Sequence, residues 1–249
     1  MTNEELLKRN QELEKEILKL KGIDSKKDEP TTYYFSQIKN IAQLEELVDI
    51  KRIYKKKIFK EWFDFEYEVS EEVENFLQKL LDKNEDLIFN YYEEDLKANF
   101  IIPLINRVDF FLIEDEIRNF FEAPLTYKTK NFIFSGEVDF MVSKGIEYPK
   151  MPYFFIQEFK KSIKPTNPQP QLLAELISAV ELNKVKSMRG AFIMGKDWYF
   201  VILEKLGKDK YQYFISQPFN SMRLDELKGI YRNLQFIKNE VREIVRGKK

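Results

Sequence analysis

Two short runs of aromatic and β-branched residues, separated by a turn-forming segment, constrain the fold of this chain most. The runs are residues 136–142 and 153–161, and Gly145, Pro149 and Pro152 lie between them. Aromatic and β-branched residues favour strands, whereas glycine and proline favour the turns that join strands. The pattern therefore predicts two neighbouring strands and, with them, a sheet.

Three polar residues interrupt these apolar runs. Asp139 lies in the first run, and the second run ends on Glu158, Phe159 and Lys160. Because side chains alternate between the faces of a strand, Glu158 and Lys160 share one face and Phe159 points to the other. If Asp139 lies on that face of the adjacent strand, two carboxylates and one ammonium group converge. Carboxylate oxygens are the ligands that hard cations such as Mg²⁺ and Mn²⁺ prefer.

The composition removes several classes of chemistry. The chain has no cysteine and no histidine, which excludes thiol nucleophiles, disulfides, Cys/His zinc sites and Ser-His-Asp triads. Any catalysis must therefore use carboxylates, lysines and a bound hard metal. With 41 basic and 42 acidic residues, the chain is not a nucleic-acid binder of the generally basic kind. Its overall charge does not exclude a local basic patch.

The chain has the composition of a folded protein and no signal for a membrane. Its 249 residues are 43% hydrophobic and 15% aromatic, which argues against disorder and suits one large domain, with or without appendages. The N-terminus lacks the apolar core of a signal peptide, and no run of about 18 apolar residues occurs. We expect a cytoplasmic protein without membrane contact.

The pattern along the chain divides it into three parts. Residues 1–30 read as a polar helix over residues 3–21 with a linker, residues 31–90 as a helical accessory region, and residues 91–249 as the main domain. A leucine recurs at every seventh position of the first part, at Leu6, Leu13 and Leu20. This spacing fits a short coiled coil that forms a homodimer, and it fits equally a helix that packs on its own domain.

The main domain alternates between predicted helices and strands. Residues 91–106 form an amphipathic helix that Pro103 should bend or shorten, because proline lacks the N–H group that a helix interior needs. The further predicted strands are 127–135, 137–144, 153–160, 190–195, 198–203 and 210–215, and the further helices are 171–182 and 222–245. This order indicates an α/β or α+β protein built on a mixed sheet.

This order of elements, with its polar residues, resembles that of the PD-(D/E)XK nuclease superfamily. Asp139 stands where the family has its first metal-binding acid, with Val138 in place of the proline, and Glu158 and Lys160 match the Glu-x-Lys strand. Gln171 and Glu175 are similar to a Gln-x-x-x-Glu helix found in poorly characterised bacterial members.

An acidic helix also precedes the strands of restriction-enzyme-like members. The matching acid here is Glu93, with Glu94 as the alternative. The resemblance covers about residues 91–205. It implies a restriction-endonuclease-like fold of the α/β (α+β) class, a mixed sheet flanked by helices, and leaves the N-terminal helix as an extension.

The acid-x-Lys triplet alone carries no weight, because it occurs five times. The pairs are Asp24 and Lys26, Asp49 and Lys51, Asp95 and Lys97, Glu158 and Lys160, and Glu226 and Lys228. Only the pair of Glu158 and Lys160 ends an apolar strand-like run, follows a strand with an aspartate and precedes a helix with a glutamine.

The resemblance implies roles for individual residues. Asp139 and Glu158 would bind Mg²⁺ or Mn²⁺, with the backbone carbonyl of Phe159 as a further ligand. Lys160 would orient the attacking water or neutralise the negative charge that develops on the phosphate.

Two further residues complete the implied site. Glu93 would be an additional ligand of the metal or water, and Gln171 would hold a phosphate or the catalytic lysine. A structural role is open for both, since Glu93 can favour a helix dipole and Gln171 can simply begin a helix.

The function expected from these features is metal-dependent hydrolysis of phosphodiester bonds, with DNA as the partner, in restriction, repair or defence against mobile elements. The alternative is a catalytically silent subunit that keeps the fold and serves in DNA binding or assembly. A general α/β interaction protein is a third reading, which requires that Asp139, Glu158 and Lys160 lie apart.

Overall fold

The computed structural model describes residues 9, 13, 16, 17, 30–160 and 167–247. Apart from four isolated positions, the helix predicted for residues 3–21 lies outside this range, and the homodimer predicted through it stays a prediction. The two strand-like runs fold as the antiparallel neighbours β4 (Phe132–Lys144) and β5 (Lys150–Lys160).

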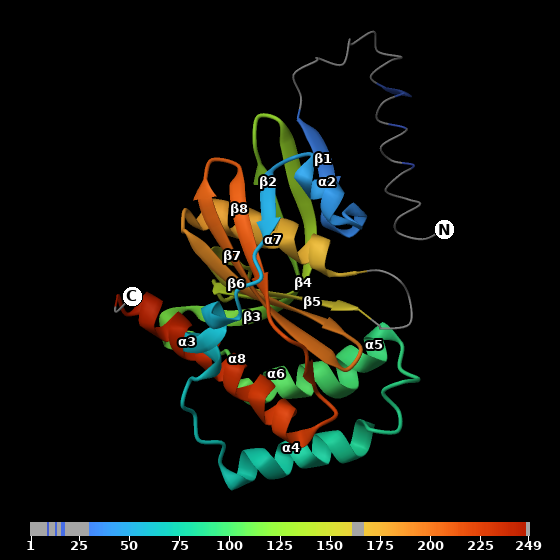
Figure 1. The fold of residues 1–249 in the computed structure, drawn as a ribbon, viewed down its shortest axis with the longest axis vertical. Helices are drawn as coiled ribbons and strands as arrows, with labels where there is room; N and C mark the ends of the chain where they lie inside the picture. The colour runs from blue at the N-terminus through green and yellow to red at the C-terminus, as the bar shows by residue number, and fades with distance from the viewer. Residues whose placement is uncertain (1–8, 10–12, 14–15, 18–29, 161–166, 248–249) are drawn as a thin grey trace.

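Nine strands of the described chain form one mixed sheet (Figure 1). The remaining strands are β1 (Thr31–Tyr34), β2 (Asp49–Arg52), β3 (Ile117–Lys128), β6 (Ser187–Met194), β7 (Asp197–Gly207), β8 (Lys210–Ile215) and β9 (Phe219–Asn220). Their order is β1-β4-β5-β6-β7-β8-β2, with β3 on β4 and β9 on β7. Strands β5 and β6 are parallel, so the chain crosses over the sheet between them, as parallel pairing requires.

The predicted boundary between a strand at residues 127–135 and a strand at residues 137–144 is wrong. Residues 132–144 form the single strand β4, and its partner β3 begins as early as residue 117. Gly136 lies inside the ladder opposite Leu125, so it does not end a strand. A Cβ atom at Gly136 would lie 2.9 Å from the ring of Phe35. Close packing against Phe35, rather than a turn, accounts for this glycine.

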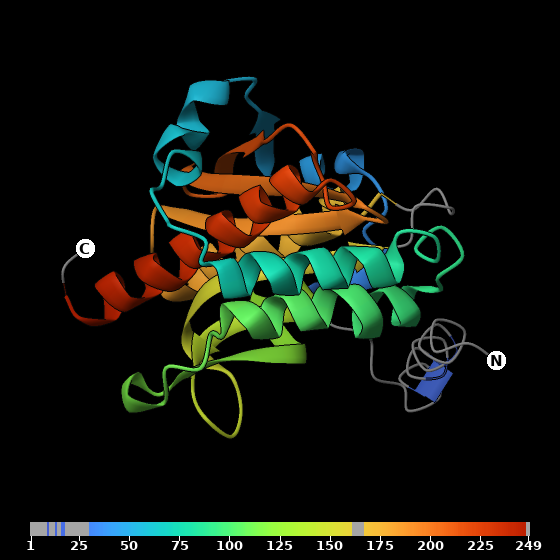
Figure 2. The ribbon, with the colours of Figure 1, turned by 90° about the horizontal axis from the view of Figure 1, so that it is seen from below.

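Helices cover both faces of the sheet (Figures 1 and 2). They are α2 (Ile41–Glu45), α3 (Lys60–Phe63), α4 (Glu71–Asn84), α5 (Glu93–Leu96), α6 (Ile102–Val108), α7 (Gln169–Asn183) and α8 (Leu224–Val245). Helices α2 and α7 bury their apolar residues against one face. Helices α3 to α6 and α8 pack against the other, and Figure 2 shows α4, α6 and α8 lying side by side. The class, a mixed sheet flanked by helices, agrees with the prediction.

Pro103 disturbs its helix as predicted, and the disturbance is a wide π-helical turn over Lys97–Ile101 between α5 and α6. In an α-helix the N–H group of residue 103 would bond the carbonyl of Asn99, but proline has no such group. The Asn99 carbonyl instead accepts a hydrogen bond of 3.4 Å from the side chain of Asn84 in α4. The π turn directly follows α5, the short helix that carries Glu93. The resemblance implies that this helix lies near the site.

Residues 31–90 are less helical than predicted. Strand β1 pairs with β4, and strand β2 pairs with β8, both in parallel. The division of the chain at residues 30 and 90 stays a prediction. Strands β1 and β2 lie between these two positions and join the accessory region to the main sheet. No helix of the described residues combines the length and the apolar character needed to cross a membrane.

Candidate active site

Asp139 and Glu158 lie at the point where the pairing of β4 and β5 ends. The last paired residues are Phe140 and Gln157, and Asp139 and Glu158 follow them in the same antiparallel register. Beyond this pair, the carboxylate of Asp139 takes the place of a backbone acceptor: its Oδ2 atom accepts a hydrogen bond of 2.8 Å from the N–H group of Phe159. The strand end thereby fixes the aspartate.

Lys160 reaches both carboxylates. Its Nζ atom lies 2.7 Å from Oε1 of Glu158 and 3.8 Å from Oδ2 of Asp139. The alternation of side chains along β5 places Lys160 beside Glu158, while the side chain of Phe159 is buried in the core, with 1% of its surface exposed. The structure thus brings Asp139, Glu158 and Lys160 together.

Helix α5 adds a third carboxylate. Oε1 of Glu93 lies 3.6 Å from Nζ of Lys160. Glu94, the alternative acid, is an exposed residue whose ion pair is with Lys97 at 3.4 Å. The geometry therefore selects Glu93 over Glu94 as the residue that faces the strands.

A second lysine, which the sequence reading missed, completes the group. Nζ of Lys97 lies 3.3 Å from Oδ1 of Asp139 and 3.7 Å from Oε1 of Glu93. Its spacing was a usable signal, because Lys97 follows Glu93 by four residues in a predicted helix and so shares its face. We call Glu93, Lys97, Asp139, Glu158 and Lys160 the carboxylate–lysine cluster.

Gln171 is linked to this cluster through Glu175. Its Nε2 atom donates a hydrogen bond of 3.1 Å to Oε1 of Glu175, one turn further along α7. The proposed contact of Gln171 with a phosphate or with Lys160 stays a prediction. Glu175 is fully buried, and the charge of Glu158 acts on it. The Gln-x-x-x-Glu spacing of the sequence had already singled out Glu175.

Burial leaves the two buried glutamates short of partners. The Oε2 atoms of Glu158 and Glu175 have no hydrogen-bond partner within the described chain. Burial, followed by the charge of Asp139, raises the pKa of Glu158 well above its ordinary value, and Lys160 opposes this only in part. Burial, followed by the charge of Glu158, raises the pKa of Glu175 in the same way.

The two lysines are held in their charged form. Burial disfavours the ammonium group of Lys160, but Glu158 and Asp139 outweigh it and raise its pKa. Burial likewise acts against Lys97, and the carboxylates of Asp139, Glu94 and Glu93 together raise its pKa. Both residues are therefore cations at neutral pH.

The cluster can attract a cation but does not form a ready acidic cage. Within the described residues, no three or more Asp or Glu side chains are arranged as ligands of a metal ion. Lys97 and Lys160 lie among the carboxylates instead. A divalent ion would have Asp139 and Glu158 as acidic ligands, and the remaining ligands would come from Glu93, backbone oxygen atoms, water or substrate.

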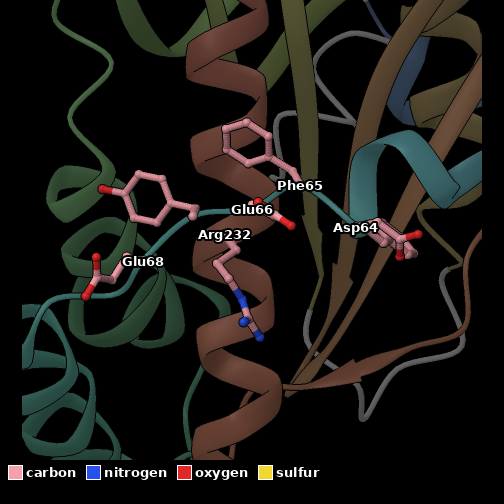
Figure 3. Close-up of a pocket in the computed structure, with 7 residues that line it drawn as sticks. Asp64, Phe65, Glu66, Glu68 and Arg232 are labelled. Atoms are coloured by element: carbon pink, nitrogen blue, oxygen red, sulfur yellow. The ribbon is translucent and has the colours of Figure 1, made fainter.

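A separate pocket of about 460 Å³ lies on the face covered by α8 (Figure 3). Residues 63–68 and Arg232 line it. Figure 3 shows Arg232 extending from α8 beside the extended segment that carries Asp64 and Glu68. This pocket shares no residue with the carboxylate–lysine cluster.

No protein-family model matches this chain, and neither does any curated protein sequence. The carboxylate–lysine cluster is therefore the feature from which we infer a function.

Proposed function

We propose that this protein is a metal-dependent nuclease that hydrolyses phosphodiester bonds in DNA, in a restriction, repair or mobile-element defence setting in the cytoplasm. The observation that carries the proposal is the meeting of Asp139, Glu158 and Lys160 at one strand end, with ammonium-to-carboxylate distances of 2.7 and 3.8 Å. A general interaction protein would not need these side chains to meet.

The order of elements supports a restriction-endonuclease-like arrangement within this proposal. The acidic helix α5 comes first, followed by strands β3, β4 and β5, helix α7 and strand β6. Strand β4 carries Asp139, and the end of β5 carries Glu158 and Lys160. This is the order in which the resembled superfamily places its metal-binding and catalytic residues.

The buried carboxylates fit a divalent cation. Oε2 of Glu158 is buried without a hydrogen bond from any described residue, and a buried acceptor of this kind costs free energy unless a cation or donor compensates it. Asp139 and Glu158 would hold Mg²⁺ or Mn²⁺, with the backbone carbonyl of Phe159 as a further ligand. When bound, the ion supplies charge neutralisation at the phosphate and a more acidic water molecule.

The protein's own groups then have distinct tasks. Lys160, held in place by Glu158, orients the attacking water and neutralises negative charge at the phosphate. Glu93 contacts Lys160 from α5 and acts as a further water or metal ligand. Gln171, which donates a hydrogen bond to Glu175, would hold a phosphate or Lys160.

The proposal is tested with the purified full-length chain, plasmid DNA and either MgCl₂ or EDTA. Wild type should cleave DNA only with Mg²⁺. The cleavage rate of Lys160→Ala should be lower by a factor of at least about a hundred. Lys205→Ala is the matched control, because Lys205 is also ion-paired at 2.6 Å and is similarly exposed, 28% against 23% for Lys160. Equal rates for wild type and Lys160→Ala would refute the assignment.

The alternative is a catalytically silent subunit for DNA binding or assembly. It is favoured by one observation, the lack of a three-acid metal group within the described residues. A calorimetric Mg²⁺ titration separates the two functions. A wild-type chain that binds DNA but neither binds Mg²⁺ nor cleaves supports the silent subunit.

A further inference from the structure

Asp139 is held by two cations rather than one. Its Oδ2 atom faces Lys160 and the backbone N–H group of Phe159, and its Oδ1 atom faces Nζ of Lys97 at 3.3 Å. Only 12% of the Lys97 side chain is exposed. Both oxygen atoms that a divalent ion could use are therefore already engaged in the protein without metal.

The local fold places Lys97 at this position. Lys97 begins the π-helical turn that Pro103 brings about, and π turns often mark functional positions. Its Nζ atom lies over the aromatic ring of Phe159, 5.9 Å from the ring centroid. Glu93, four residues earlier, contacts the same ammonium group from the helix itself. The position is thus determined by packing on several sides.

Lys97 also has a third carboxylate partner, Glu94, at the surface. Oε1 of Glu94 lies 3.4 Å from Nζ of Lys97, and the side chain of Glu94 is 79% exposed. The flexible lysine stem allows the ammonium group to shift toward solvent while it keeps this contact. Lys97 can therefore leave Asp139 without losing every partner.

A divalent ion on Asp139 would meet strong repulsion from this ammonium group. Two like charges a few ångströms apart in a partly buried site repel each other, because little solvent lies between them to screen the charges. Either the ion is excluded, or Lys97 moves away from Oδ1. Once it has moved, its charge is free to meet a substrate phosphate at the same site.

We infer that Lys97 is a second functional lysine of the proposed nuclease site. It neutralises Asp139 while no divalent ion is bound, gives way when Mg²⁺ binds, and then contacts a phosphate of the DNA backbone. This inference rests on the proposed function, because it assumes that Asp139 is a metal ligand. It makes metal binding weaker and substrate binding stronger than they would be without the lysine.

The test measures Mg²⁺ binding by calorimetry and DNA binding by fluorescence anisotropy in CaCl₂, which limits cleavage, with full-length variants. Lys97→Met should bind Mg²⁺ about tenfold more tightly, since a like charge is gone. It should bind DNA several-fold more weakly, with a salt dependence reduced by about one phosphate contact. Lys97→Arg keeps the charge and should stay within about threefold of wild type in both measurements.

Lys205→Met is the control for loss of an ion-paired lysine, and it should change neither affinity. A purely structural role for Lys97 would weaken both kinds of binding together or leave both unchanged, so opposite shifts support the inference. If wild type binds Mg²⁺ and cleaves DNA but Lys97→Met binds Mg²⁺ no more tightly, the inference is wrong and the nuclease stands. If wild type neither binds Mg²⁺ nor cleaves, both are wrong.

Discussion

Helix α7 carries two glutamates that are similar in sequence context and opposite in surroundings. Glu181 has a partner for each oxygen atom: Nζ of Lys205 lies 2.6 Å from Oε2, and the hydroxyl of Tyr211 donates to Oε1 at 2.5 Å. Glu175 has one hydrogen bond, from Gln171, and its Oε2 atom has no partner within the described residues. One carboxylate is satisfied and the other is not.

The difference separates a carboxylate that joins elements of the fold from one that lies beside the proposed site. A carboxylate with both oxygen atoms bonded holds neighbouring elements together, and the partly buried Glu181 joins α7 to β7 and β8 through Lys205 and Tyr211. Glu158 and Glu175 differ from Glu181, because each has one buried oxygen atom without a hydrogen-bond partner in the described residues, and such atoms lower stability. Under the proposed function, a bound cation would compensate these acids.

The largest expected difference between the two regions is in activity. Glu158→Gln should lower Mg²⁺-dependent DNA cleavage about a thousandfold, because it removes a charged group that the proposed metal needs. Glu181→Gln should change the rate by less than about threefold. Single-turnover rates at saturating Mg²⁺ measure both. A Glu158→Gln protein that cleaves as fast as Glu181→Gln would remove the functional distinction.

Stability should respond in the reverse order. Glu181→Ala should destabilise the fold by about 2 to 3 kcal/mol, since it leaves Lys205 and the buried hydroxyl of Tyr211 without their partner. Urea denaturation of the full-length chain in EDTA gives the free energy of unfolding. A loss below about 0.5 kcal/mol would show that this pair is no more structural than a surface ion pair.

The smallest effect is a pH dependence that belongs to Glu175. Its pKa is raised above the ordinary 4.5 by burial and by Glu158, so the folded chain binds more protons than the unfolded one. Its contribution to stability is therefore fully present below about pH 4.5 and decreases as pH rises toward the folded pKa. Relative to wild type without metal, Glu175→Gln should be the more stable chain at pH 8, because the amide places no charge in this buried position.

Near pH 4.5 the same variant should differ little from wild type, because the carboxyl group is then neutral like the amide. Thermal unfolding in EDTA at both pH values measures the comparison. A stability difference that is equal at the two pH values would mean that Glu175 does not titrate in this window.

Part of the candidate site could be predicted from local sequence. Glu158 and Lys160 are two residues apart in one strand, so the period of the strand alone places them on one face. The neighbouring strand with Asp139 followed from the apolar runs and the turn residues between them. The prediction began this pair of strands too late in the chain and divided β4 at Gly136. Gly136 lies inside β4, where it accommodates Phe35.

The rest depended on contacts between distant elements. The choice of Glu93 over Glu94, the position of Lys97 on Asp139 and the missing partner of Glu175 arise from how α5 and α7 meet the end of β5. The sequence by itself determined which side chains share a face, because that follows from the period of one element. Only the tertiary structure decided which faces meet and which charges lack a partner, because packing between elements far apart in the chain sets those distances.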